Sequence, residues 1–248
     1  MTKVIQISDC HISARADAIY RGINPRDTLE SLLKTIKAAK PDALLVTGDL
    51  AEDGSEPAYQ YLHQTLEKLN VPILTVPGNH DRARLQTRYF PNTPVDQALV
   101  FDLPGWQLIL LNSVIEGEVP GTLSASMMKS LERAVLNSDL PCIVVLHHQA
   151  VLCGSPWIDR FPLLNPEELL FVLGNRKNIK AVLWGHIHQE YSSQHYAVSL
   201  LGAPSTAANS QTGCEKFTFD ETGPSFRWMT LGPLGEFATG INTAPGRY

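Results

Sequence analysis

Five short stretches of the sequence combine histidine, aspartate and asparagine at spacings that suit a metal centre. They are Asp9-Cys10-His11, Gly48-Asp49, Gly78-Asn79-His80-Asp81, His147-His148 and Gly185-His186-Ile187-His188. Imidazole nitrogens with carboxylate or amide oxygens form a ligand set that suits transition metals. Six of the eight histidines fall in these stretches, so the sequence predicts one metal site rather than unrelated polar residues.

Each of these residues also has a simpler interpretation when it is taken alone. Asp9 would serve equally well as a turn or helix cap, and Asp49 and Asn79 follow glycine, as turn residues often do. A single histidine such as His147 or His188 is usually exposed or hydrogen-bonded in a core. The joint pattern, in which every stretch follows an apolar segment, favours the metal site.

The spacing within two stretches indicates how their side chains reach the site. Asp9 and His11 are two residues apart, as are His186 and His188. On an extended segment such residues point to the same side, so each pair is expected to reach one metal cluster. Glycine lets the backbone turn tightly or approach a ligand closely. It occurs in three of the stretches, at Gly48, Gly78 and Gly185.

Other kinds of catalytic site find little support. The sequence contains no GxSxG, GxxxxGK[ST] or GxGxxG motif, which excludes a nucleophile elbow, a P-loop and a dinucleotide fingerprint. The four cysteines are scattered without a CxxC pair, and we expect free thiols in a reducing compartment. Thiol catalysis by Cys10 or Cys214 has only nearby histidines in its favour.

The apolar segments that precede the five stretches read as buried strands, and helical patterns alternate with them. Since ligands bind beyond the carboxyl ends of strands in α/β sheets, five strand ends can converge on one point. The expected strands are 4–7, 43–46, 71–76, 143–146 and 179–184, and the expected helices are 25–39, 56–69, 124–136 and 166–173. This alternation favours one α/β domain of two packed sheets with helices outside.

The remaining segments lean toward antiparallel strands. A hairpin is expected from 99–103 to 106–111 around Pro104-Gly105, and further strands near 191–200, 216–220 and 226–231. His63 is expected on a solvated helix face and His195 on a peripheral strand. We expect a single domain over 1–248, with the catalytic motifs in 5–190, C-terminal strands in 191–233 and a loose tail at 234–248.

Composition excludes several function classes. The chain has 248 residues, of which 44% are hydrophobic and 18% charged, with a net charge of −5. These values are typical of a globular protein and offer no basic face for nucleic acid or a polybasic membrane anchor. No apolar run of ~18 residues could span a bilayer. Asp9 interrupts the N-terminus too early for a signal peptide, so we expect a cytoplasmic protein.

The order and spacing of the five stretches resemble the five signatures of the calcineurin-like metallophosphoesterases. Within that superfamily, the sequence is most similar to the bacterial class III 3′,5′-cyclic-nucleotide phosphodiesterases, in particular the cyclic-AMP branch. This likeness includes the chain length and several further segments. They are Ile7-Ser8-Asp9-Cys10-His11, Tyr20-Arg21-Gly22-Ile23-Asn24, Thr47-Gly48-Asp49-Leu50, Trp157-Ile158-Asp159 and Gly185-His186-Ile187-His188-Gln189-Glu190.

The resemblance implies a four-layer α/β/β/α sandwich of two mixed β-sheets flanked by helices, with two transition-metal ions. It implies that Asp9, His11 and His188 hold one metal, often iron. It implies that a second metal, often iron, manganese or zinc, is held by Asn79, His147 and His186, and that Asp49 bridges the two. The sequence departs from the family pattern in two places: Gln149-Ala150 replaces a common proline, and Trp184 stands where a small residue or cysteine is common and is expected to pack into the core.

A dinuclear centre suggests a mechanism for phosphodiester hydrolysis. Two metals would activate a bridging hydroxide for in-line attack and neutralise the phosphoryl oxygens. His80 follows a ligand without being needed as one, so we assign it as the general acid that protonates the departing 3′-oxygen. Asp81 is expected to orient His80 or raise its pKa. The product from 3′,5′-cyclic AMP would be 5′-AMP.

The expected partner is a cyclic-nucleotide substrate, with a homodimer as a further option. The residues expected to bind the substrate are His11, Asp49, Asn79, His80 and His188. Base selectivity is expected from Arg15, Arg21, Asn24 and the loop 152–161 with Trp157. Two alternatives stay open: a broader esterase for glycerophosphodiesters, 2′,3′-cyclic or other nucleotides, and a non-catalytic metal-binding scaffold.

Overall fold

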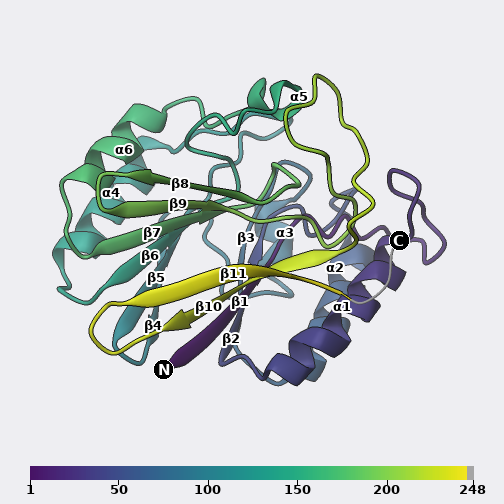
Figure 1. Ribbon diagram of the computed structural model, residues 1–248, viewed down its shortest axis with the longest axis horizontal. Helices are drawn as coiled ribbons and strands as arrows, with labels where there is room; N and C mark the ends of the chain where they lie inside the picture. The colour runs from purple at the N-terminus through teal and green to yellow at the C-terminus, as the bar shows by residue number, and fades with distance from the viewer. Residues whose placement is uncertain (245–248) are drawn as a thin grey trace.

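Two β-sheets lie face to face in the computed structural model, with helices on both outer sides (Figure 1). The structure describes residues 1–244. The layer order is α/β/β/α, which confirms the expected fold class. Within the described residues, none of the helices combines the length and the apolar character needed to cross a bilayer.

The first sheet has the strand order β11-β10-β1-β2-β3. Its parallel part comprises β1 (Thr2–Ile7), β2 (Ala43–Thr47) and β3 (Ile73–Val76). Two antiparallel strands, β10 (Ser225–Leu231) and β11 (Phe237–Thr243), complete it on the side of β1. Nearly every residue of β1 and β2 is buried, as parallel strands covered on both faces require.

The second sheet has the order β4-β5-β6-β7-β9-β8. Its four inner strands are mutually parallel, and both edge strands are antiparallel to their neighbours. The inner strands are β5 (Trp106–Leu110), β6 (Cys142–Val145), β7 (Ile179–Trp184) and β9 (Val198–Gly202). The edges are β4 (Leu99–Leu103) and β8 (Tyr191–His195). Both sheets are therefore mixed.

Helices cover the outer face of each sheet. α1 (Pro25–Ala39) and α2 (Glu56–Leu66), which a 3₁₀ turn η1 (Glu67–Leu69) extends, lie on the first sheet. α4 (Ala125–Leu136) and α6 (Pro166–Gly174) lie on the second (Figure 1). These four match the expected helices closely. Two helices of a single turn, α3 (Ala83–Gln86) and α5 (Pro156–Asp159), were not expected.

A central apolar cluster holds the two sheets together. It joins side chains of β1, β2, β3 and β10 to side chains of β5, β6, β7 and β9. Its fully buried members include Val4, Leu45, Val76, Leu108, Ile143 and Leu183. Because this cluster fixes one sheet against the other, it also fixes the carboxyl ends of their parallel strands.

The C-terminal part differs from the sequence-based expectation in two places. Residues 216–220 do not form a strand; an isolated bridge pairs Ser210 with Phe219 instead. The expected loose tail from 234 is wrong through residue 243, because β11 pairs with β10 along its whole length. Trp228 lies opposite Gly240, and a Cβ at Gly240 would crowd its ring, so the glycine makes room for the indole. Residues 245–248 lie outside the described part.

Trp184 packs in the same way at the end of β7. Its side chain is fully buried in the cluster between the second sheet and its helices, as expected. The neighbouring position on β9 is Gly202, where a Cβ would approach the indole nitrogen to 2.8 Å. The absence of a side chain at Gly202 therefore accommodates the bulky residue.

Candidate metal centre

All five chemistry-bearing stretches follow the carboxyl ends of parallel strands. Asp9 and His11 follow β1, Asp49 follows β2, and Asn79 to Asp81 follow β3 of the first sheet. In the second sheet, His147-His148 follow β6 and His186 to His188 follow β7. The two sheets thus contribute to one cluster from opposite sides.

The backbone at these strand ends is left-handed rather than extended. Asp9, His11, Asp49, His186 and His188 all have φ between 46° and 66°. The expectation that each pair separated by two residues shares one face of an extended segment is therefore wrong. Backbone bonds hold the turns: the N–H of Asp9 donates to Gly48 O at 3.0 Å, and that of His11 to Asp49 O at 2.9 Å.

One donor group gathers Asp9, His11 and His188. His188 Nε2 lies 3.2 Å from His11 Nε2 and 3.4 Å from Asp9 Oδ1. All three side chains are buried, and their ligand atoms lie within 4.8 Å of one another. Two imidazole nitrogens and a carboxylate oxygen are all electron-pair donors. A cation between them would stabilise their close approach.

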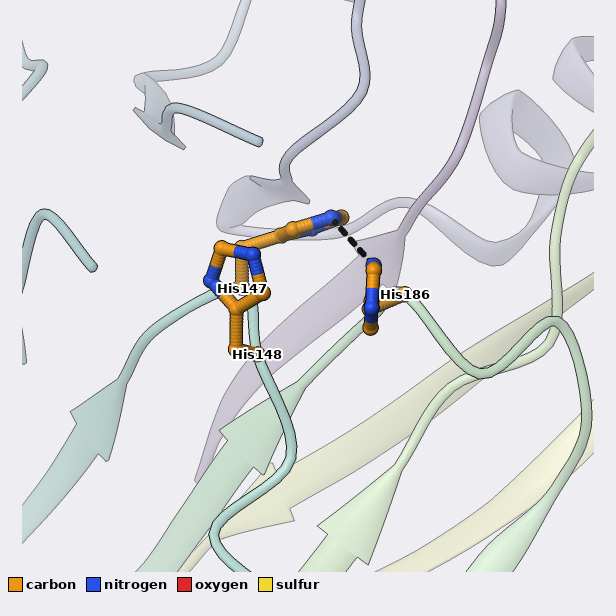
Figure 2. A group of neighbouring side chains, drawn as sticks. All are labelled: His147, His148 and His186. Atoms are coloured by element: carbon orange, nitrogen blue, oxygen red, sulfur yellow. Dashed lines mark hydrogen bonds between the residues drawn. The ribbon is translucent and has the colours of Figure 1, made fainter. Parts of the chain in front are cut away.

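A second donor group gathers Asn79, His147 and His186. His147 Nε2 lies 3.3 Å from Asn79 Oδ1 and 3.2 Å from His186 Nδ1. Figure 2 shows the contact between the His147 and His186 rings, which come from the ends of β6 and β7. His186 and His188 are only two residues apart in sequence, but their rings belong to different donor groups.

The carboxylate of Asp49 lies between the two groups. Its Oδ2 is 3.7 Å from His11 Nε2, and its Oδ1 is 3.6 Å from His147 Nε2. A carboxylate that offers one oxygen to each side can bridge two cations. A Cβ at Gly48 would collide with the His147 ring, and one at Gly78 with the Asp49 carboxylate. Glycine at these positions therefore allows the close approach.

The outward-facing nitrogens of the four histidines are already engaged. Each donates one ring N–H to an oxygen, so that in its neutral form the other nitrogen directs a lone pair at the cluster. The acceptors are Glu52 Oε2 for His11 (2.6 Å), Thr47 O for His147 (2.7 Å), Phe161 O for His186 (3.0 Å) and Ala208 O for His188 (2.7 Å). This donor set fits two transition-metal ions.

His148 lies beside the cluster but has both ring nitrogens engaged elsewhere. Its Nδ1 contacts Ser113 Oγ at 2.8 Å, and its Nε2 contacts Val119 O at 3.0 Å. The ring of His148 is drawn with those of His147 and His186 in Figure 2. Of the two adjacent histidines, His147 is thus the one with a nitrogen free to act as a ligand. The next residue, Gln149, anchors its loop by donating to Ile158 O at 3.1 Å.

The electrostatics of the cluster favour a positive charge beside Asp49. Burial alone would lower the pKa of His147, but the carboxylates of Asp49 and Asp9 raise it to about 9. Burial, with the charges of neighbouring histidines, lowers the pKa of His186 and His188 well below the usual range. Those two rings are therefore neutral imidazoles, the form in which histidine binds metals.

His80 stands at the rim, where its ring nitrogen Nδ1 contacts Glu52 O at 2.9 Å. Its ring lies edge-on to His11 with 5.0 Å between centroids. Burial would lower the pKa of His80, but the Asp49 carboxylate and Glu52 raise it. With Nδ1 holding a proton for Glu52 O, Nε2 is the atom able to exchange a proton with a substrate.

Glu52 is a functional candidate that the sequence analysis missed. Its carboxylate accepts from His11 at 2.6 Å and lies 3.4 Å from His80 Nδ1, while its carbonyl accepts from His80. No motif or periodicity marked it, since an acidic residue three positions after Asp49 reads as ordinary loop composition. Its position near both rings can only be seen once the loops are folded.

Asp81 was expected to orient His80, but its carboxylate makes no hydrogen bond to the His80 ring among the bonds described for residues 1–244. Its buried carboxylate instead accepts from the backbone N–H groups of Gly78, Leu50 and Ala51 at 2.9–3.1 Å, and from Tyr59 Oη at 3.0 Å. These bonds fix the loop after β3 against the loop after β2. The orientation of His80 is therefore due to Glu52, although the charge of Asp81 still contributes to raising the pKa of His80.

The expected base-reading residues divide into two pairs. Asn24 caps α1 and bonds Ala16 O, and exposed Arg15 pairs with Asp17, so neither reaches the cluster by these contacts. Arg21 and Trp157 do lie near it, with the Trp157 ring 6.0 Å from that of His188. His63 is half-exposed on α2, and His195 ends the edge strand β8, both as expected.

Comparisons with known proteins agree with this architecture. The model of the calcineurin-like phosphoesterase family matches residues 2–190. The 3′,5′-cyclic adenosine monophosphate phosphodiesterase CpdA of Pseudomonas aeruginosa is 33% identical over 96% of this chain and 89% of its own length. The 3′,5′-cyclic-nucleotide phosphodiesterase alr5338 of a Nostoc species is 34% identical over 98% of this chain and 92% of its own.

A solved structure shares the fold at low sequence identity. A dimetal phosphatase from Danio rerio superposes with a TM-score of 0.69 over 92% of this chain and 95% of its own, at 12% identity. The family match covers all five stretches, and the relatives align over nearly the whole chain. The chain therefore belongs to the calcineurin-like phosphoesterase family.

Proposed function

We propose that this protein is a two-metal phosphodiesterase that hydrolyses 3′,5′-cyclic AMP to 5′-AMP. The observation that carries the proposal is the Asp49 carboxylate, whose two oxygens face two separate groups of imidazole nitrogens. Phosphodiester hydrolysis is a reaction for which paired metal sites are well suited. The substrate is suggested by the names of the relatives, which align over most of their own length.

In this proposal, the two donor groups each hold one ion. Asp9, His11 and His188 hold the first, Asn79, His147 and His186 hold the second, and Asp49 is shared. When bound, the ions supply activation of a water nucleophile and neutralise charge on the phosphoryl oxygens. Nitrogen and oxygen donors of this kind suit borderline ions, and we propose iron in one site with iron, manganese or zinc in the other.

The protein's own contribution to the reaction is a proton at His80. His80 Nδ1 donates to Glu52 O at 2.9 Å, so a protonated ring presents Nε2–H to the substrate. We assign this proton to the departing 3′-oxygen of the ribose, which would otherwise leave as an unstable alkoxide. The half-exposed position of His80 lets the ring recover its proton from solvent after each turnover.

The test combines metal analysis with turnover of a substrate panel by the purified chain. The panel contains cyclic AMP, cyclic GMP, 2′,3′-cyclic AMP, bis(p-nitrophenyl) phosphate and glycerophosphoethanolamine. We expect about two transition-metal ions per chain and the highest kcat/KM with cyclic AMP. Asp49→Asn should lower both metal content and turnover, whereas His63→Asn on the outer face of α2 should change neither.

Other outcomes of the panel favour the alternatives. A higher kcat/KM for glycerophosphoethanolamine or 2′,3′-cyclic AMP would replace the cyclic-AMP proposal by a broader esterase. Two bound ions without turnover of any substrate would favour a non-catalytic scaffold. Absence of transition metals after loading with iron, manganese or zinc would contradict the dinuclear centre itself.

A further inference from the structure

Three aromatic rings surround one guanidinium at the rim of the metal centre. The Arg21 guanidinium carbon lies 3.8 Å from the centroid of the Phe217 ring, 5.4 Å from that of Tyr20 and 5.9 Å from that of Trp157. Arg21 is exposed, as its position in a loop would suggest. Arg26 also lies over a ring, that of Tyr61 at 3.8 Å, but among the arginines of residues 1–244 Arg21 is the one with three rings around its guanidinium.

This cluster adjoins the donor group of His11 and His188. The Tyr20 ring stacks on the His11 ring at 4.0 Å with an angle of 11° between planes. The rings of Trp157 and Phe217 meet that of His188 edge-on at 6.0 Å and 6.1 Å. A phosphate held between the donor groups would therefore have these rings beside it.

The three loops that carry the cluster are fixed by hydrogen bonds. Tyr20 and Ile23 exchange two backbone bonds across a tight turn, with Arg21 and Gly22 at φ 48° and 91°. Arg21 Nε donates to Tyr20 Oη at 3.0 Å. The segment carrying Phe217 is tied to α5, since Trp157 N donates to Cys214 O and Gly213 N to Ser155 Oγ. The rings are thus placed before any ligand arrives.

We propose that Arg21, Trp157 and Phe217 form a stacking subsite for the base of a nucleotide whose phosphate lies at the metal centre. Flat guanidinium and aromatic faces are the groups on which nucleobases stack in proteins. Such stacking uses the π face that every base has, so it distinguishes nucleotides from base-free phosphoesters more than one base from another. This inference rests on the proposed function and names the part of the substrate that the cluster reads.

An inhibition experiment measures binding at the subsite separately from hydrolysis of a cyclic nucleotide. Metal-loaded protein hydrolyses bis(p-nitrophenyl) phosphate as a reporter, and the inhibition constants of 5′-AMP and ribose 5-phosphate are measured. The two inhibitors share sugar and phosphate, so their ratio reports the base alone. We expect 5′-AMP to bind at least tenfold more tightly in the wild type. Phe217→Leu and Arg21→Ala should each reduce that ratio severalfold by weakening 5′-AMP, with ribose 5-phosphate unchanged.

Controls address folding and the nature of the contact. Phe217→Tyr keeps a ring and should keep the wild-type ratio, and Phe171→Leu on the exposed face of α6 should have no effect. An unchanged melting temperature shows that a variant is folded. A wild-type ratio near one, or an unchanged ratio in both Phe217→Leu and Arg21→Ala, would overturn the proposal. An equal loss of both inhibitors in Arg21→Ala would also overturn it, because it would place Arg21 at the phosphate.

The same measurements separate this inference from the proposed function. If cyclic AMP is not hydrolysed, yet the preference for 5′-AMP exists and falls in the variants, the proposed function fails and the subsite stands. If cyclic AMP is hydrolysed and the variants bind 5′-AMP like the wild type, the subsite fails and the function stands.

Discussion

The chemistry available to each histidine of the metal centre depends on which ring nitrogen already has a partner. His11, His147, His186 and His188 each direct one nitrogen outward to an oxygen and one inward to the cluster. His148 lies equally close but has partners on both nitrogens. Sequence alone can place histidines at a strand end, but it cannot say which nitrogen a neighbouring carbonyl will engage.

A prediction at the residue scale concerns the proton of His80. Its pKa is raised above the ordinary value of about 6.5 because Asp49 and Glu52 outweigh the effect of burial. A general acid works when protonated, so activity should be full below this pKa and fall as pH rises through it. His80→Ala should lower kcat by on the order of 10²–10⁴ and remove that alkaline limb, with metal content unchanged.

The pH profile of kcat measures this effect, and His63→Ala serves as the matched control. His63 is half-exposed and lies beside Glu67 on α2, away from the strand ends. Full kcat in His80→Ala, or an alkaline limb that persists in this variant, would show that another group donates the proton.

A second prediction at this scale concerns Glu52. Its carboxylate fixes the ring of His11 through a 2.6 Å bond, and partners of this kind raise the basicity of a metal ligand. Glu52→Ala should weaken metal binding about 10–100-fold. Titration of the apo protein with Mn²⁺ measures the affinity. Asp53→Asn is the control, because exposed Asp53 accepts hydrogen bonds from Ser55 and from the backbone of Ala14 rather than from a histidine of the cluster. Equal affinities in Glu52→Ala and the wild type would contradict the role.

At the scale of elements, the strand ends were predictable and the loops were not. Apolar runs followed by polar residues placed five stretches at the carboxyl edge, because a buried strand must end where its apolar run ends. The loops after β1 and β7 adopt left-handed turns instead of extended chain, which residue type alone does not reveal. Glu52 lies on a segment whose spacing carries no periodic signal, and the pattern around Phe217 predicted a strand that does not form.

The missed strand β11 illustrates a further limit. Its sequence, Phe237–Thr243, includes Gly240 and only weak alternation of apolar and polar residues. It forms because β10, which pairs with β1 along one edge, offers its other edge for pairing, and because Trp228 lies against Gly240. Pairing of this kind depends on a partner strand rather than on local preference.

A prediction for the elements concerns the N-terminus of α4. Ser124 Oγ accepts from Met127 N at 3.1 Å, whereas Ser55 at the start of α2 makes no side-chain cap bond. Ser124→Ala should lower the free energy of unfolding by about 1 kcal/mol, and Ser55→Ala should have a much smaller effect. Urea denaturation of both variants measures the difference. Equal losses in the two variants would contradict the assignment of the cap.

At the scale of the whole molecule, the donor groups connect the two sheets. Asp9, Asp49 and Asn79 follow strands of the first sheet, while His147, His186 and His188 follow strands of the second. The central cluster joins the same sheets through apolar contacts. We therefore propose that residues 1–244 unfold as one unit, and that bound metal strengthens the connection between sheets.

Removal of metal tests this connection. A ligand at 100 times its dissociation constant stabilises the folded state by about 2.7 kcal/mol. For a chain of this size, that corresponds to a melting temperature about 5–10 °C lower after chelation. Differential scanning calorimetry with and without a chelator measures the shift, and Asp49→Asn should show little of it. An identical melting temperature for the loaded and the chelated wild type would rule out such a link.

The left-handed backbone at Asp9, His11, Asp49, His186 and His188 has a consequence for ion selection. Each such residue costs about 1 kcal/mol relative to ordinary helix or strand conformation, and this cost is met when the polypeptide folds rather than when an ion enters. The shape of the metal site is therefore set by the folded backbone rather than by the ion that binds. Which ion occupies the site would then depend on the supply of ions of similar radius more than on any adjustment of the site.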